Sequence, residues 1–311
     1  MRIARALALV ARSAAAQTPA PVTIERLIDT GRLGAAREQL ARLRVASPES
    51  PRVLLLDAMI LYREDKPAEA LAQLQRLLSA LPQHANGHKL AALCLVALRR
   101  ADEAGPHIAE AVRLAPDDFM ARYYLGLHQI DRRQPERAAA TFVEAITRNP
   151  DYPDSHTMFG FAMEQLGRDE EALPAYRKGV ELNERLRLQR ASPGLYLGRF
   201  LQTRHRDEEA LPVLEAAVGA NGQSAESWLL LGKARAALGR YEPAVAALDR
   251  AFELSPRDKR VRYALMQTYQ RMGRTEDARR ERAAYDRMAS QELTRWEESL
   301  QAPPLGLFLP Q

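Results

Sequence analysis

The sequence has few of the residues that redox chemistry, nucleic-acid binding and membrane insertion require. Cys94 is the only cysteine among 311 residues, which excludes an internal disulfide or a cysteine metal site, and we expect it to pack in a core. Aromatic residues make up only 6%, and acidic residues are interspersed with the basic ones that leave a net charge of +5. A nucleic-acid surface would need a basic stripe with stacking aromatics, so no nucleic-acid partner is expected. No run approaches the ~18 apolar residues of a membrane helix, so we expect no stable membrane span.

Motifs for catalysis are missing as well. The sequence has no Gly-x-Ser-x-Gly, no phosphate-binding Gly-Lys-Ser/Thr loop and no His-Glu-x-x-His. His84 and His88 are four residues apart and could share a metal ion, but Pro82 and Gly87 flank them and no cysteine or carboxylate ligands follow at a matching spacing. Packing explains these histidines better. We therefore expect no enzyme, no cofactor and no metal site.

The pattern that is present is a repeat, best seen between Ala225 and Asp258. In this stretch Trp228 and Gly232 lie on one face of a short helix, Gly239 provides a turn, and Pro256 stops a second helix. Prolines that close equivalent units recur 34 residues apart at Pro48, Pro82, Pro116 and Pro150. The alanine that opens each second helix also recurs, at Ala36, Ala70, Ala104, Ala138, Ala172, Ala210, Ala244 and Ala278. Because one such unit cannot bury its apolar stripe alone, it needs copies beside it.

These residues resemble the tetratricopeptide repeat family. Counting slots so that the recurring alanine is slot 20, the family has a large apolar residue in slot 4, a small one in slot 8, a large one in slot 24 and proline in slot 32. Trp228, Gly232, Leu248 and Pro256 fill those slots in turn. The resemblance implies an all-α fold: a right-handed superhelical solenoid of about eight helix-turn-helix repeats.

The ends of the chain depart from the repeat. Residues 1–22 have a basic start, a short apolar run and small residues before Gln17, which is typical of a weak signal peptide followed by a linker. We expect an exported protein, periplasmic or secreted, with a cytoplasmic one as the alternative. Residues 23–290 form the repeats, and residues 291–311 a capping helix and an apolar tail at Leu305–Leu309. Four extra residues within Glu181–Arg190 predict a longer second helix in the fifth repeat.

The resemblance also implies a concave groove lined by the first helix of each repeat. Its apolar and aromatic half contains Met59, Tyr62, Leu93, Tyr123, Leu127 and Phe161, and its basic or polar positions are Lys89, Arg199, Lys233 and Tyr263. Leu195 and Leu229 either line the groove or pack on neighbouring repeats. The family's clamp for acidic C-termini needs asparagines where this chain has Leu93 and Tyr124, so that specificity is not expected.

The sequence thus favours a non-enzymatic scaffold that binds a protein or peptide segment in its groove. Apolar anchors such as Tyr123 and Phe161 would provide most of the affinity, while Arg199 and Lys233 would orient acidic groups. The alternative is a structural role, in which the groove or the Leu305–Leu309 tail mediates self-association.

Overall fold

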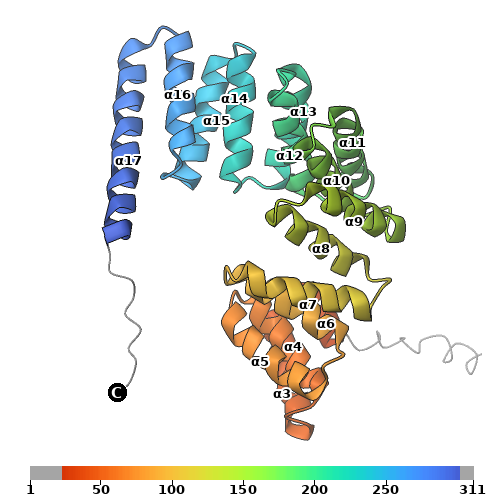
Figure 1. Ribbon diagram of the computed structural model, residues 1–311. Coiled ribbons are helices and arrows are strands. Elements are labelled where there is room, and N and C mark those ends of the chain that lie inside the picture. The colour runs from red at the N-terminus through yellow and green to blue at the C-terminus, as the bar shows by residue number, and fades with distance from the viewer. Residues whose placement is uncertain (1–22, 302–311) are drawn as a thin grey trace, which may run out of the picture. The chain divides into compact units, whose positions relative to one another are not determined.

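A computed structural model describes residues 23–301, with side chains through Gln291 (Figure 1). The expected leader and the expected apolar tail lie outside the described residues, so export, self-association through the tail and the expected domain boundaries stay predictions. The chain divides into two compact units, one extending to Leu125 and the other beginning at Gly126.

The described residues form sixteen α-helices and no strand, which confirms the all-α repeat fold. The helices of the first unit are α2 (Ile24–Asp29), α3 (Leu33–Ala46), α4 (Pro51–Arg63), α5 (Pro67–Ala80), α6 (Ala85–Ala97) and α7 (Ala101–Leu114). Helix α8 (Phe119–Asp131) contains the boundary between the units. The second unit continues with α9 (Pro135–Arg148), α10 (Pro153–Gln165), α11 (Asp169–Arg185), α12 (Ala191–Gln202), α13 (Asp207–Ala220), α14 (Ala225–Ala237), α15 (Tyr241–Leu254), α16 (Lys259–Arg271) and α17 (Thr275–Gln301).

The two helices of each repeat are joined by a turn with one residue in the left-handed region. These residues have φ between 56° and 73° and recur every 34 positions, apart from one step of 38: Gly31, Asp65, Arg99, Arg133, Gly167, His205, Gly239 and Gly273. Half of them are glycine, for which this conformation carries no steric cost. The other half are not glycine, so this conformation has a steric cost for them. They keep it because the helices on both sides fix the turn.

Close approach of the paired helices depends on the small residue of slot 8. A Cβ atom placed on Gly232 of α14 would lie 2.6 Å from Cγ of Leu248 on α15, and one on Gly198 of α12 would overlap with Cδ2 of Leu214 on α13. Both leucines are fully buried. Slots 8 and 24 therefore form one interlocking contact, as the repeat pattern predicts.

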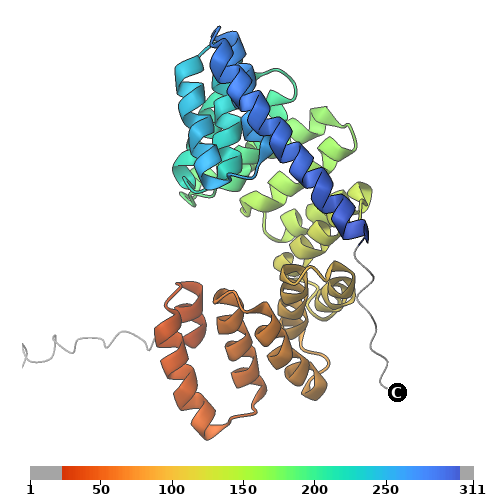
Figure 2. The ribbon, with the colours of Figure 1, turned by 90° about the vertical axis from the view of Figure 1, so that its left-hand side faces the viewer.

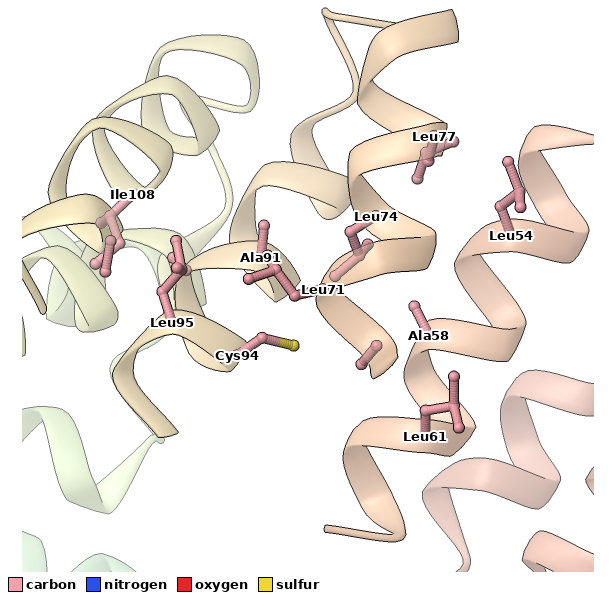
Figure 3. Close-up of a cluster of buried hydrophobic side chains, with 13 residues drawn as sticks. Leu54, Ala58, Leu61, Leu71, Leu74, Leu77, Ala91, Cys94, Leu95 and Ile108 are labelled. Carbon is pink, nitrogen blue, oxygen red and sulfur yellow. The ribbon is translucent and has the colours of Figure 1, made fainter. Parts of the chain in front are cut away.

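Within each unit, apolar clusters connect neighbouring repeats. In the first unit, one cluster joins Leu54 and Leu61 of α4 to Leu74 of α5, Leu95 of α6 and Ile108 of α7 (Figure 3). Cys94 lies inside this cluster, fully buried, and burial raises the pKa of its thiol to about 11. The prediction that Cys94 packs in a core is confirmed.

In several repeats the side chain of slot 4 has a ring N–H that donates a hydrogen bond to the connector before the first helix. Nε1 of Trp228 donates to the carbonyl of Gly222 over 2.9 Å. His88 and His156 occupy the same slot, and Nε2 of each lies 2.8 Å from a carbonyl six residues earlier, that of Pro82 and that of Pro150. A carbonyl oxygen can only accept, so both histidines carry the proton on Nε2.

The four-residue insertion mostly lengthens α11. This helix has 17 residues where α9 has 14, as expected, and it ends at Arg185. Arg187 and Gln189 then adopt positive φ. The side chain of Asn183 closes the loop, because its amide donates to the carbonyl of Arg190 and its oxygen accepts from the N–H of Arg190.

The repeats end in a long polar helix, as the sequence predicts. Helix α17 has 27 residues and packs against α16 at the end of the second unit (Figure 2). Its only buried residue among those with described side chains is Ala278. A polar outer face of this kind closes a repeat array without leaving an apolar surface exposed.

Arginine–carboxylate pairs connect neighbouring repeats. Arg37 on α3 forms two hydrogen bonds of 2.6 Å with Glu64 at the end of α4, and they lower the pKa of Glu64 to about 2. Arg260 of α16 likewise pairs with Glu226 of α14 at 2.5 Å. The abundance of arginine is thus explained in part by contacts within the protein.

Candidate partner-binding surface

The expected groove residues of the first unit lie on α4, α6 and α8, each the first helix of its repeat. Met59 packs against the cluster formed by α2, α3 and α4, and Tyr62 against the cluster of Leu54 and Leu95. Leu93 is half-buried, and Tyr123 lies edge-on to Tyr124 with ring centroids 5.7 Å apart. These side chains are partly covered by their own repeats and keep some exposed apolar surface. Their role in binding stays a prediction.

Lys89 of α6 has a partner inside the protein. Its ammonium group pairs with Oδ2 of Asp118, and the two side chains are only 24% and 22% exposed. The other oxygen of Asp118 accepts backbone hydrogen bonds from Met120 and Ala121 at the start of α8. The charge of Lys89 is therefore largely neutralised by a helix-capping carboxylate.

In the second unit the expected groove residues Phe161 and Arg199 lie against one another. The guanidinium of Arg199 on α12 lies 5.1 Å from the ring centroid of Phe161 on α10 and 5.0 Å from that of Tyr196. The rings of Phe161 and Tyr196 meet edge to face at 5.5 Å. Leu127 lies half-buried on α8.

A hydrogen bond to Glu164 fixes the position of Arg199. Nη2 of Arg199 donates to Oε2 of Glu164 over 3.3 Å, and the hydroxyl of Tyr176 donates to the same oxygen over 2.5 Å. Glu164 is only 14% exposed, and Tyr176 is fully buried. Burial raises the pKa of Tyr176, so the phenol keeps the proton that it donates. The position of Arg199 is thus determined by packing and by hydrogen bonds to buried groups.

Arg199 also borders a cavity of about 280 Å³ formed by the first helices α12, α14 and α16, which we call the cationic cavity. Its walls carry three cations, Arg199, Lys233 and Arg271. Gln202, Thr203, His205, Asp207, Leu230, Ala236, Ala237, Ala264, Gln267 and Thr268 complete the lining.

Charge in the cationic cavity is unbalanced. Asp207 is the one carboxylate in its lining, and burial raises the pKa of Asp207 while Gln202, His205 and Lys233 oppose that shift. Within the described part of the chain, neither Lys233 nor Arg271 forms a salt bridge. The cavity therefore attracts anions.

A second cavity of about 220 Å³ adjoins the first, and we call it the Tyr196 cavity. It is lined by Leu195, Tyr196, Arg199, Glu226, Leu230 and Arg260. Its charged side chains are paired: Arg199 with Glu164, and Arg260 with Glu226 and Asp258. Leu195, Tyr196 and Leu230 give it an apolar wall.

Two of the expected groove residues, Arg199 and Lys233, line the cationic cavity. Leu229, by contrast, is 2% exposed and packs in the cluster with Leu248, so it is a packing residue.

Tyr263 is 46% exposed and meets Tyr285 of α17 with ring centroids 5.9 Å apart, away from the cationic cavity. The sequence prediction missed Arg271, although it lies on α16, the first helix of its repeat, and first helices were expected to line the groove. It had no signal for His205 or Asp207, which belong to a turn and a second helix.

The histidines examined for metal binding have other contacts. Nδ1 of His84 accepts the N–H of Gly87, and Nδ1 of His88 lies 2.9 Å from Nδ1 of His107. The ring centroids of His88 and His107 are 5.1 Å apart. This distance equals the 2.9 Å between the two Nδ1 atoms plus about one ring radius on each side, so the nitrogens lie between the two rings. The two nitrogens thus point head-on at one another, as in an N–H···N hydrogen bond. Among the residues with described side chains, no group of three or more potential ligands could hold a metal ion.

This architecture defines an α-helical repeat protein, and comparison with known sequences identifies its family. The tetratricopeptide repeat profile matches residues 24–85, 58–119, 90–153, 123–186, 200–259 and 236–301. The chain belongs to the tetratricopeptide repeat family. Proteins of this fold are protein–protein interaction scaffolds and are generally not enzymes, so the fold implies protein partners. No curated protein matches the sequence. Between residues 23 and 301, no helix is both long and apolar enough to cross a bilayer.

Solved structures show the same fold. The Cut9–Hcn1 hetero-tetramer of the APC/C matches with a TM-score of 0.71 and 14% identity, over 79% of this chain and 48% of the other, so this chain spans about half of that length. A tetratricopeptide repeat protein from Parabacteroides merdae matches with a TM-score of 0.59 and 17% identity, over 79% of this chain and 95% of the other. YrrB, described as having an unusual peptide-binding site, matches with a TM-score of 0.44 and 21% identity over 61% and 96%. At these identities the first two matches support the fold alone, and the YrrB match supports no conclusion.

Proposed function

We propose that this protein is a non-enzymatic interaction scaffold whose second unit holds an acidic segment of a partner protein against α12, α14 and α16. One observation carries the proposal: Arg199, Lys233 and Arg271 converge on one cavity whose lining holds a single carboxylate, that of Asp207, and neither Lys233 nor Arg271 forms a salt bridge within the described part of the chain. Complementary charge steers partners to a site and selects among them.

The construction of the cavity supports the same proposal. Its cations come from three successive repeats, so each helix adds one contact to a segment that lies across them. Arg199 is positioned by Glu164 and by two aromatic rings, which reduces the entropy lost when a ligand binds. Small residues at Ala236 and Ala264 leave room for a bound main chain.

The first unit offers a different surface. Tyr62, Leu93 and Tyr123 keep partly exposed apolar area, while Lys89 is neutralised by Asp118. We propose that this unit contributes apolar contacts to the same class of partner, and that Phe161 and Leu127 do so in the second unit.

The proposal is tested with a short fluorescent peptide rich in glutamate and an otherwise identical peptide with glutamine in place of each glutamate. The wild-type protein should bind the glutamate peptide at least about tenfold more tightly, and the difference should shrink as NaCl is raised because the charges are exposed. Lys233→Glu combined with Arg271→Glu should abolish the preference.

Arg257→Glu provides the matched control, because Arg257 is exposed on the connector between α15 and α16 and does not line the cavity. It changes net charge per site by the same amount and should leave the preference intact. Equal binding of the two peptides by the wild-type protein would contradict the proposed function. Static light scattering over a concentration series then tests the self-association that the sequence leaves open.

A further inference from the structure

The cationic cavity contains one group whose charge opposes the binding of an acidic ligand. Asp207 is the first residue of α13, is partly buried, and lines the cavity together with Arg199, Lys233 and Arg271. Within the described part of the chain, Asp207 forms no salt bridge. Its carboxylate therefore borders the space that an acidic group of the partner would enter, and no cation of the cavity neutralises it by direct contact.

The preceding repeat shows how a carboxylate in the same place is neutralised. Asp169 is likewise the first residue of a second helix, α11, and Nε of Arg204 donates to its Oδ2 over 2.8 Å. Hydrogen bonding to Arg204 lowers the pKa of Asp169. In the next repeat the place of Arg204, directly before the left-handed turn residue, is taken by Leu238. Asp207 therefore lacks the arginine that its counterpart has.

The surroundings of Asp207 make its charge easier to remove by acid. Burial is the main cause that raises the pKa of Asp207, and it outweighs the neighbouring groups that lower it. A carboxylate with a raised pKa takes up its proton at a higher pH than an ordinary one. The charged and polar groups around it come from α12, the turn that follows, α13, α14 and α16: Arg199, Gln202, His205, Glu208, Lys233 and Arg271.

The size of the cavity sets how much this charge affects a bound anion. A roughly spherical cavity of 280 Å³ is about 8 Å across. Two like charges about 8 Å apart in largely hydrated surroundings change a dissociation constant by about threefold at low salt. The three cations outweigh the single carboxylate, so Asp207 weakens the attraction for an acidic group without abolishing it.

We propose that Asp207 regulates the cationic cavity: its carboxylate weakens the binding of an acidic segment at neutral pH, and its protonation on acidification strengthens that binding. This inference rests on the proposed function and adds how the affinity of the same site is controlled. The cations and the helices that carry them need not move, because only the charge of one side chain in the lining changes.

The experiment compares the full-length protein with its Asp207→Asn variant, which keeps the shape of the side chain and removes the charge. The probe is a short fluorescent peptide rich in cysteic acid, whose sulfonate groups stay ionised in mild acid, so that only the protein titrates. Fluorescence polarisation at low salt gives both affinities from neutral pH down to about pH 4.

At neutral pH the Asp207→Asn variant should bind the sulfonate peptide about threefold more tightly than the wild-type protein. On acidification the wild-type affinity should approach that of the variant, so that the ratio of the two affinities falls toward one. His205 is the other titratable side chain in the cavity lining, and it is present in both proteins. The ratio therefore separates the charge of Asp207 from that of His205.

Glu208→Gln provides the matched control. Glu208 is exposed and does not line the cavity, so water and salt screen its charge, and its loss should leave the affinity at neutral pH nearly unchanged. An equal gain in Glu208→Gln and Asp207→Asn would assign the effect to net charge and overturn the inference.

Other outcomes are equally decisive. An Asp207→Asn variant that binds the sulfonate peptide no more tightly than the wild-type protein would overturn the inference, and weaker binding would mean that Asp207 positions the cations instead. A gain that stays constant with pH would overturn regulation by protonation. All of these leave acidic-segment binding in place, whereas glutamate peptides that bind both proteins no better than their glutamine analogues would overturn the proposed function as well.

Discussion

Replacing Gly232 by alanine tests the interlocking contact that brings the two helices of a repeat together. The added methyl carbon would lie 2.6 Å from Cγ and 2.8 Å from Cδ2 of Leu248, well inside normal contact. Cγ moves only if χ1 of Leu248 changes or the helices separate. Because Leu248 is fully buried, no alternative rotamer has free space.

Two effects of opposite sign compete. Alanine is favoured over glycine inside a helix by about 1 kcal/mol. Overpacking a well-packed core costs about 1–3 kcal/mol. With a contact this short at a branched carbon, overpacking should dominate, and Gly232→Ala should destabilise the second unit by about 1–2 kcal/mol.

Gly219 supplies the matched control. It lies near the end of α13 in the same unit, and a Cβ atom placed there meets nothing within 4 Å. Gly219→Ala should therefore stabilise the protein, by about 0.5–1 kcal/mol. Urea unfolding can be followed by the fluorescence of Trp228 in α14, in a Trp296→Phe background that removes the second tryptophan.

The sign of the effect should reverse when Leu248 is shortened. Leu248→Ala alone should cost about 2–5 kcal/mol. Adding Gly232→Ala on that background should restore up to about 1 kcal/mol, since the obstruction is gone and only helix propensity remains. A Gly232→Ala change that destabilises to the same extent on both backgrounds would refute the steric reasoning.

Three further measurements follow from the structure. Arg99→Gly should raise the free energy of unfolding in urea by up to about 1 kcal/mol because it relieves a left-handed backbone, whereas Arg99→Ala should not; equal changes would contradict this. The pKa of His107 is lowered by burial and by His88, so its contribution to stability is complete above the ordinary pKa of 6.5 and is lost as pH falls through the lower folded value. The protection of α6 and α7 amides against hydrogen exchange, relative to the unfolded chain at the same pH, should fall more on acidification than in His107→Phe, and a parallel response would count against the pair. Trp228→Phe should cost about 1 kcal/mol because the Gly222 carbonyl loses its donor, and Trp228→His should recover part of that loss; no difference between the two would exclude the hydrogen bond as the cause.

Spacing in the sequence was sufficient to predict the helical hairpins. The recurring alanine, the small residue before it and the proline after it each have a packing or backbone consequence, and these positions appear in the structure as contacts of Gly232 with Leu248 and as buried Ala244. Such consequences are local, because a repeat touches its own partner helix and the next repeat.

The chemistry of the surface was less predictable. Slot positions assign a residue to a face but do not say which opposite charge a long side chain reaches. Lys89 belongs to the groove by its slot, yet its ammonium group reaches Asp118, 29 residues later, which also caps a helix. Asp207 joins the cationic cavity from a second helix, where no slot rule places a groove residue.

The arginine–carboxylate pairs between neighbouring repeats have a mechanical consequence. They join hairpins that are each held together internally by apolar packing, and exposed ion pairs weaken as dissolved salt screens them. Within each unit, the surrounding electrolyte should therefore adjust how readily one hairpin tilts against the next while the hairpins themselves persist. The flexibility between neighbouring hairpins would then depend on the salt concentration, while the fold of each hairpin would not.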